Sequence, residues 1–337
     1  MIDNPARRDA GVTLQISVAP SDLRHAREIL PHQLRRWAAQ VDEVLFTLDL
    51  GREGGSRAEG QLEDRREIER LLGGLCSRYP TARIAQVDYR AAVADEVSHR
   101  FSQRRPAPER DCYGKVVYPY FFGLWAARNR YVLHVDSDMM FGGGSQTWIA
   151  EAKRALTHPD VFSCSPLPGP PSPKPLSRQV AIRHAGSRRR HALSRNAVPV
   201  ALPGLAGPAF RFARMSTRNF ILDCSMFDDG QSAVPLARPG LRALLGAASK
   251  GALGSGNPVC APAETSLSRA MERQRLLRVD FLGTAPGMWS LHPPARSAAF
   301  HRALPEIVRR VETDEIPEGQ LGDYDLNDSM IDVGRAV

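Results

Sequence analysis

The stretch Tyr131-Val-Leu-His-Val-Asp136-Ser-Asp138-Met-Met-Phe141 decides how the rest of the chain is interpreted. Its apolar beginning predicts a buried central strand, which ends on two carboxylates one residue apart. In open α/β sheets, ligands bind beyond the carboxyl ends of the strands. Two close carboxylates there can hold a hard divalent ion that also touches substrate phosphates. A solvated turn at the end of a strand is the simpler interpretation of the tripeptide taken alone.

The residues before this stretch alternate between strand and helix patterns. We expect strands over 12–19, 44–49 and 83–88, with helices over 23–41 and 62–75 between them. Pro31 predicts a kink or break in the first helix, and residues 90–113 are expected to form an irregular connection. Strands that alternate with helices in this way indicate a parallel, doubly wound sheet.

The length of 337 residues allows one large unit or two intimately joined units with a substantial core. No apolar run is long enough to span a membrane, and the N-terminus has no apolar signal segment, so we expect a cytoplasmic protein. The five cysteines form no Cys-x-x-Cys pair. Structural zinc and a disulfide framework are therefore not expected.

The formal net charge of +8 raises the question of a nucleic-acid partner. Almost all of the basic residues are Arg, which is typical of a composition bias rather than of a selected basic patch, so we expect no nucleic-acid binding. An anionic donor or acceptor accounts for the charge equally well.

Asp136-Ser137-Asp138 after an apolar strand resembles the Asp-x-Asp motif of GT-A-fold nucleotide-sugar glycosyltransferases, the family-two-like group in particular. The resemblance implies an α/β, GT-A-like (Rossmann-like) fold, with a mostly parallel sheet flanked by helices and with acceptor-side elaborations. It also implies a metal-dependent glycosyltransferase of the hexosyltransferase type. Such an enzyme moves a sugar from a nucleoside diphosphate sugar donor to a hydroxyl-bearing acceptor, which is a small molecule, a glycan or a lipid-linked molecule.

The resemblance also assigns donor-binding and metal-binding roles. Residues after the first strand and acids at later strand ends contact the nucleotide, and Asp136 and Asp138 hold Mn²⁺ or Mg²⁺. The implied nucleotide contacts are Ala19, Pro20, Asp49, Asp88, Asp136 and Ser137. Lys115 is a candidate for the diphosphate. For Asp49, closing a turn is an equally supported role.

Two later residues match the resemblance by position and type. Glu264, near a predicted helix start, stands where inverting enzymes of this kind carry an acidic dyad, but its neighbour is Thr265. Either Glu264 is the general base, or it binds acceptor hydroxyls in a retaining reaction. A favourable charge at a helix N-terminus is the structural alternative. His292 stands where a late histidine would complete the metal site, and imidazole with carboxylates suits Mn²⁺.

We divide the chain into an N-terminal tail (1–11), a donor-binding half (12–145), an acceptor-binding half (146–296), and a C-terminal helix with an acidic tail (297–337). Residues 165–218 form a basic insertion that is rich in Pro at its start and contains no Asp or Glu. The insertion is either a lid whose Arg side chains grip phosphate or an acidic acceptor, or a solvated segment without catalytic consequence. The acidic end is expected to be frayed or to contact a partner.

Two other classes of function remain open. A nucleotidyltransferase acting on a sugar phosphate shares the nucleotide-binding sheet, but it needs a Gly-rich, basic loop after the first strand, which Ala19-Pro-Ser-Asp-Leu does not supply. A non-catalytic nucleotide- or glycan-binding protein would keep the fold without the metal. Walker, Gly-x-Gly-x-x-Gly, His-Glu-x-x-His and Gly-x-Ser-x-Gly motifs are absent. The sequence leaves the oligomeric state open.

Overall fold

A computed structural model of the chain describes residues 9–51, 59–102, 107–172, 198–228, 234–236 and 260–331. Several predicted features lie outside these ranges. They are most of the N-terminal tail, most of the glycine-rich turn after Asp49, the basic run Arg188–His191 and the helix expected over 237–250.

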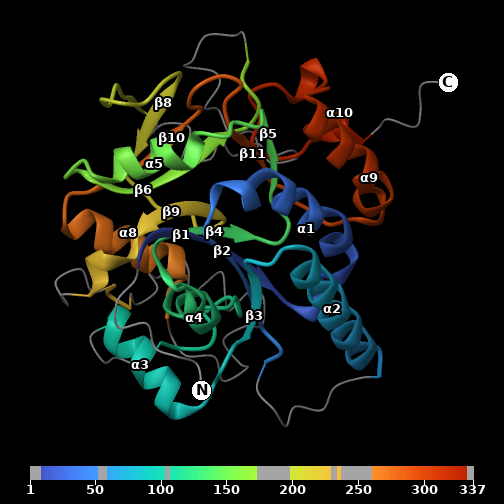
Figure 1. Cartoon of the computed structure of the whole chain (residues 1–337), viewed down its shortest axis with the longest axis vertical. Coiled ribbons are helices and arrows are strands. Elements are labelled where there is room, and N and C mark those ends of the chain that lie inside the picture. The colour runs from blue at the N-terminus through green and yellow to red at the C-terminus, as the bar shows by residue number, and fades with distance from the viewer. Residues whose placement is uncertain are drawn as a thin grey trace.

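The centre of the molecule is an eleven-stranded mixed sheet (Figure 1). The main path runs in the order β3-β2-β1-β4-β9-β6-β10-β8-β7, and β11 joins β6 and β5. Only β5, β8 and β9 run against the other described strands. The strands are β1 (Asp9–Val18), β2 (Glu43–Leu48), β3 (Ala82–Gln86), β4 (Asn129–Asp136), β5 (Met140–Gly142), β6 (Val161–Pro168), β7 (Val198–Pro199), β8 (Ala209–Phe212), β9 (Asn219–Asp223), β10 (Leu277–Phe281) and β11 (Trp289–Leu291).

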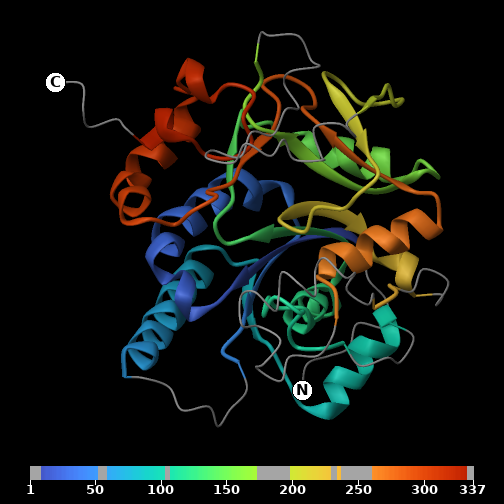
Figure 2. The ribbon, with the colours of Figure 1, turned by 180° about the vertical axis from the view of Figure 1, so that it is seen from behind.

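Helices cover both faces of the sheet (Figures 1 and 2). One core lies between the sheet and α1, α2 and α5, and a second lies between the sheet and α3, α4 and α8. A third core joins α9 and α10 to β5 and β11. The described helices are α1 (Leu23–Trp37), α2 (Glu59–Arg78), α3 (Ala91–Ser102), α4 (Tyr118–Ala126), α5 (Trp148–Leu156), α8 (Ala263–Arg273), α9 (Ala298–Thr313) and α10 (Asp328–Ile331).

The predicted α/β architecture with a mostly parallel, helix-flanked sheet is confirmed. Strand β1 shows how the sheet packs against helices on both of its faces. Its apolar residues Val12, Leu14 and Ile16 pack toward α1 and α2. The alternate residues Thr13 and Gln15 are polar and fully buried on the other side, because successive side chains of a strand point to opposite faces. The sheet therefore carries a buried polar row next to α4.

The structure corrects three expectations about local structure. The chain does not break at Pro31, which lies inside α1, and the helix continues to Trp37 because its buried apolar face outweighs one lost hydrogen bond. The expected irregular connection contains helix α3, whose Val97 and Phe101 are buried. The acidic C-terminal segment is packed rather than frayed up to residue 331, with Leu326 and Met330 buried in the third core.

By its sequence, the glycine run 142–144 after the Asp-x-Asp motif predicts a flexible turn whose backbone can approach a ligand closely. In the structure a side chain of the chain itself takes that space. A Cβ on Gly142 would lie 1.9 Å from the Trp289 ring, and Gly143 has a φ of +81°, which favours glycine. These glycines therefore let β5 pair with β11 directly after the motif.

Candidate active site

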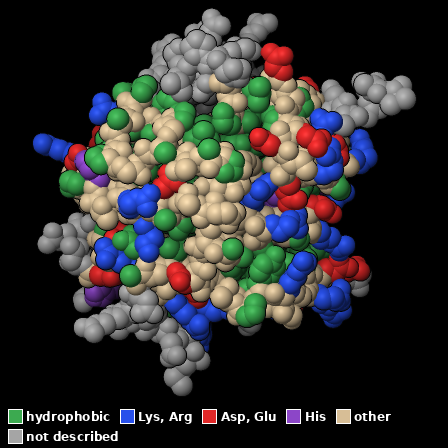
Figure 3. Space-filling view, turned by 45° about the horizontal axis from the view of Figure 1, so that its top comes forward, with side chains coloured by type: hydrophobic (Ala, Val, Ile, Leu, Met, Phe, Trp, Pro, Cys, Tyr) green, Lys and Arg blue, Asp and Glu red, His purple; other side chains and the backbone are tan. Residues whose placement is uncertain are grey.

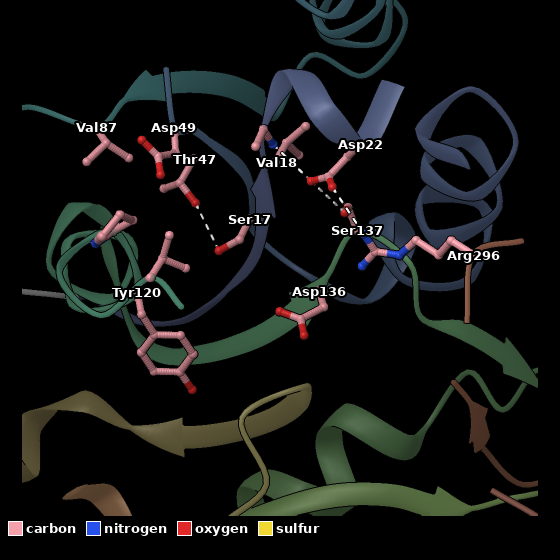
Figure 4. A pocket seen from close by; sticks show the side chains of 13 residues that line it. Ser17, Val18, Asp22, Thr47, Asp49, Val87, Tyr120, Asp136, Ser137 and Arg296 are labelled. Atoms are coloured by element: carbon pink, nitrogen blue, oxygen red, sulfur yellow. Dashed lines mark hydrogen bonds and ion pairs between the residues drawn. The ribbon is translucent and has the colours of Figure 1, made fainter. Parts of the chain in front are cut away.

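Two adjoining cavities lie beyond the carboxyl ends of β1, β2 and β4. The first, here the Asp136 cavity, has a volume of about 200 Å³ and is lined by Ser17, Val18, Ala19, Asp22, Thr47, Asp49, Val87, Val116, Pro119, Tyr120, Asp136, Ser137 and Arg296 (Figure 4). The second, of about 530 Å³, shares Ala19, Asp49 and Val116 with it and adds Pro20. Five of the predicted nucleotide contacts therefore line one continuous depression: Ala19, Pro20, Asp49, Asp136 and Ser137.

Asp136 is held from within the sheet by the buried polar row. His134, two residues earlier on the same face of β4, places its Nε2 3.3 Å from Asp136 Oδ1. On its other side, His134 Nδ1 hydrogen-bonds to Gln15 Oε1, and Gln15 Nε2 donates to Thr47 Oγ1 at 2.5 Å. The Asp136 side chain remains 42% exposed and points into the cavity (Figure 4). The network thus orients a carboxylate that stays open to a ligand.

The turn between the two acids is fixed by α1. Gln33 Nε2 donates to the Asp136 carbonyl at 2.9 Å and to the Met139 carbonyl at 2.8 Å. His32 accepts from the Phe141 amide at Nε2 (2.9 Å) and donates from Nδ1 to Glu312 in α9 (2.9 Å). Helix α1 therefore connects the motif backbone to the C-terminal helix.

Asp138 differs from Asp136 because it is buried and already paired. Arg296, in the loop before α9, donates from Nη2 to Asp138 Oδ2 at 2.5 Å and also lies 3.5 Å from Asp22. Burial opposes the charge of Asp138, but the Arg296 guanidinium, aided by His292, outweighs it and holds the pKa of Asp138 below its ordinary value. The other carboxylate oxygen, Oδ1, is buried without a hydrogen-bond partner among the described residues. An unpartnered buried oxygen of this kind is costly unless a ligand or ion satisfies it.

Ser137, between the two acids, is held from both sides. Its hydroxyl donates to Asp22 Oδ2 at 3.0 Å, and His25 Nε2 lies 3.1 Å from its oxygen. Burial lowers the pKa of His25 to about 4, so this imidazole is neutral at pH 7. The carboxylate contacts the serine rather than His25 Nδ1, so the group lacks the order of a hydrolase triad. Its role is to fix the motif.

His292 is among the groups whose charge lowers the pKa of Asp138. Its Nδ1 is 3.0 Å from Asp325 Oδ1, and its backbone pairs with the segment around Asp325. Metal-binding histidines commonly donate their second ring nitrogen to a carboxylate in this way. Within the described ranges, however, no three His, Cys, Asp or Glu side chains converge as a ready metal cluster.

Glu264 lies in the first turn of α8 and is exposed. The charges of Glu264 and Asp136 both act on the hydroxyl of Tyr120. Burial, followed by these two carboxylates, raises the pKa of Tyr120 well above its ordinary value, so the phenol stays protonated. Tyr120 is 7% exposed, and its hydroxyl has no hydrogen-bond partner among the described residues. Tyr120 therefore lines the Asp136 cavity with a protonated hydroxyl that has no partner among the described residues.

The structure does not bring every predicted residue to the site. Asp88 pairs with Arg90 at 2.5 Å, and it lines neither cavity. The Lys115 side chain is exposed and also lines neither one, although the adjacent Val116 lines both. These two residues remain predictions without geometric support.

Sequence patterns missed Tyr120, His134, Arg296 and Asp325. His134 had a readable signal, since it shares a strand face with Asp136. Tyr120 lies in an aromatic stretch that is typical of a core helix, and Arg296 and Asp325 reach the site only through the path of the C-terminal segment. No sequence pattern marks them.

One face of the described surface carries charges of both signs. On the face that Figure 3 presents, Lys and Arg side chains are scattered among Asp and Glu rather than gathered in one basic patch. Within the described part of the chain, no helix combines the length and apolar character needed to cross a membrane.

No family model matches the chain, and no curated protein matches its sequence. Solved structures do resemble it. One is TarS 1-349 of S. aureus in complex with UDP-GlcNAc, at 9% identity and a TM-score of 0.38, covering 91% of this chain and 68% of that chain. Another is the mannosyltransferase PcManGT from Pyrobaculum calidifontis in complex with GDP-Man and Mn²⁺, at 12% identity and 0.34, covering 90% and 64%.

A third is 4-diphosphocytidyl-2C-methyl-D-erythritol synthase from Anaerococcus prevotii DSM 20548, at 10% identity and a TM-score of 0.37, covering 89% of this chain and 96% of that chain. Because every TM-score is below 0.5, no function is carried over from any of the three.

Proposed function

We propose that this protein is a glycosyltransferase that moves a sugar, of the hexosyl type, from a nucleoside diphosphate sugar to a hydroxyl-bearing acceptor. One observation carries the proposal: a cavity at the carboxyl ends of β1, β2 and β4 is lined by the exposed Asp136 carboxylate, and Asp138, two residues later, has one buried oxygen without a partner among the described residues. This is where open α/β sheets bind nucleotides.

The nucleoside would occupy the wide end of the depression. Asp49 Oδ1 accepts from the Gly51 amide and from the Tyr89 hydroxyl, both at 2.8 Å, and this fixes the carboxylate for a ribose hydroxyl. Ala19 and Pro20 would form the wall on the β1 side. Arg296 lines the Asp136 cavity and would meet the diphosphate, which a guanidinium fork matches well.

A divalent ion fits the remaining donors. Mg²⁺ in nucleotide sites is held by one or two carboxylates together with substrate phosphates, so a three-residue protein cluster is not required. Asp136 and Asp138 Oδ1 would hold Mn²⁺ or Mg²⁺, with His292 as the predicted assisting residue. When bound, such an ion neutralises charge on the diphosphate leaving group.

The acceptor would approach from the side of α8. Glu264 would accept the proton of the acceptor hydroxyl, which requires hydrogen-bonding distance in the ternary complex. The protonated Tyr120 hydroxyl would donate a hydrogen bond to the substrate between the two carboxylates. His134 and Gln33 would hold Asp136 and its turn in place throughout.

A nucleotidyltransferase is less well supported. The segment after β1 is a single 3-10 turn, Pro20–Asp22, whose Asp22 is tied to Ala19 and Ser137. It offers no run of free backbone amides and no basic side chain for a triphosphate.

A ligand panel tests the proposal. Nucleoside diphosphates, nucleoside triphosphates and nucleotide sugars are each added with Mn²⁺, Mg²⁺ or chelator, and the melting temperature is measured, since a ligand of the folded state raises it. We expect a metal-dependent rise with one nucleoside diphosphate and its sugars. A rise with triphosphates alone would favour the nucleotidyltransferase, and no rise with any nucleotide would contradict both.

A further inference from the structure

A third cavity lies one strand away from Asp136 on the same edge of the sheet. It has a volume of about 30 Å³, and Ser165, Asn219, Arg278, Asp280, Ser290 and Tyr324 are among the residues that line it. Asn219 opens β9 and pairs with Val135, the residue before Asp136. This Arg278 cavity therefore adjoins the proposed reaction site on the side of β6 and β10.

Two polar atoms in the Arg278 cavity lack partners. Arg278, which is 4% exposed, donates from Nε and Nη2 to the two oxygens of Asp280, each at 2.7 Å. Its third nitrogen, Nη1, is buried without a hydrogen-bond partner among the described residues, and so is the hydroxyl of Ser290, which is 1% exposed. Leaving two such groups unsatisfied is costly, so the cavity is built to receive an oxygen-bearing group.

The charges around the cavity are of both signs. Asp280 balances Arg278, and Arg218, the residue before Asn219, has no carboxylate partner within the described part of the chain. Burial raises the pKa of Tyr324, the charges of Arg218 and Arg278 lower it, and those of Asp325 and Asp136 raise it. The two atoms without partners can both donate a hydrogen bond, however, and a guanidinium donor pairs best with an anionic oxygen.

The geometry of these hydrogen-bond donors indicates which class of oxygen-bearing group fits the cavity. Nη1 carries two N–H groups in the plane of the guanidinium, and Ser290 adds one O–H. A planar, two-oxygen anion matches such donors, and the small volume suits it better than a tetrahedral phosphate. A group bound here lies close to Asp136, because Asn219 lines the cavity and pairs with Val135, the residue before Asp136.

We propose that the Arg278 cavity binds a carboxylate of a substrate, carried either by the transferred sugar or by the acceptor. The proposal rests on the proposed sugar transfer and specifies its substrate class. It assigns Arg278 and Ser290 as direct ligands of the carboxylate and Arg218 as the cation that attracts it.

Matched acid and neutral probes test this inference. Binding of glucuronate and glucose, with UDP present, and of UDP-glucuronate and UDP-glucose is measured by calorimetry at equal ionic strength. We expect at least one acid to bind about tenfold or more tightly than its neutral counterpart. A preference within the UDP-linked pair places the carboxylate on the donor, and a preference within the free pair places it on the acceptor.

Two variants locate the preference. Ser290→Ala removes a hydroxyl that has no partner among the described residues, so the fold should be retained, and Arg218→Gln removes a half-buried charge. Each should lower the preference for the acid about tenfold. The control Arg211→Gln makes the same charge change at an exposed position of β8 that does not line the cavity, and it should retain the preference.

The inference is overturned if neither acid binds more tightly than its neutral counterpart, or if the preference survives in both Ser290→Ala and Arg218→Gln. This failure differs from failure of the proposed function, which would appear as the absence of any metal-dependent nucleotide shift. Free glucuronate keeps the test informative even if the donor base is not uridine.

Discussion

The Asp136 cavity and the Arg278 cavity lie on one sheet edge, one strand apart, yet the polar atoms that they leave without partners differ in kind. At the first, Asp136 lines the cavity, and the neighbouring Asp138 keeps one acceptor oxygen without a partner among the described residues. At the second, these atoms are a guanidinium nitrogen and a serine hydroxyl, and the Asp280 oxygens are already engaged by Arg278. On our proposals, the first site binds a cation with phosphates and the second binds an oxyanion.

The largest effect on turnover is expected from Asp138→Asn. Replacing the buried carboxylate by an amide removes one ligand of the proposed ion, whose effect on a leaving group is worth several kcal/mol. Turnover should fall about 10³-fold or more. Asp160→Asn, an exposed change at the opposite edge of the sheet, is the control and should leave turnover intact. Near-normal turnover of Asp138→Asn would contradict the proposal that Asp138 holds a catalytic metal ion.

Glu264→Gln tests the acceptor side of the Asp136 cavity. Loss of a general base costs typically 10²-fold or more in kcat, and nucleotide binding should stay unchanged because Glu264 lines neither donor-side cavity. Steady-state kinetics and calorimetry separate the two quantities. Glu272→Gln, at the far end of the same helix, serves as control. An equal loss in both variants would assign the effect to α8 stability instead.

Arg296→Gln sharpens the comparison, because it removes the cation of the Asp136 cavity. Mn²⁺ alone should bind about tenfold more tightly, since a like charge has left Asp138, while metal-free nucleoside diphosphate should bind more weakly. Arg302→Gln, an exposed change on α9, should alter neither affinity. Weaker Mn²⁺ binding in Arg296→Gln would show that Arg296 organises the carboxylates rather than competing with the ion.

The smallest expected effect concerns stability. The hydrogen bond from His32, reinforced by Arg35, lowers the pKa of Glu312 to about 2 from its ordinary value of 4.5. A carboxylate with a depressed pKa stabilises the fold above its unfolded pKa and loses this contribution as the pH falls through the folded value. Glu312→Gln should therefore cost about 1–2 kcal/mol at pH 7, after allowance for its partial exposure.

That difference should shrink between pH 4.5 and 2, as followed by denaturant unfolding. Glu315→Gln, an exposed partner of Arg309, is the control and should leave unfolding nearly unchanged. A Glu312→Gln effect that does not vary with pH would mean that packing, not charge, joins α9 to α1.

The two cavities also differ in how far the sequence could predict them. Ala19, Asp49 and Asp136 follow apolar strands that alternate with helices, so their meeting at one edge follows from the parallel topology alone. The Arg278 cavity combines β6, β9, β10 and β11, whose order in the sheet is not their order in the chain. No local pattern marks Arg278 or Ser290 as neighbours.

The C-terminal segment illustrates the same limit. Its acidic composition predicted a tail that is frayed or contacts a partner; the frayed alternative is wrong up to residue 331, since Asp325 contacts His292 and Leu326 fills a core. These contacts depend on where the chain returns in space. The composition of a segment predicts how readily it is solvated, but it does not predict which residue a particular carboxylate contacts.

The central claim is that Asp136 and Asp138 hold a divalent ion against a nucleoside diphosphate. The most direct test is a crystal of the protein grown with Mn²⁺ and the nucleoside diphosphate that raises its melting temperature, examined by anomalous scattering. We predict one manganese peak between Asp136 and Asp138 Oδ1, contacting the diphosphate. A bound diphosphate with no peak at these carboxylates, or with a peak elsewhere, would contradict the claim.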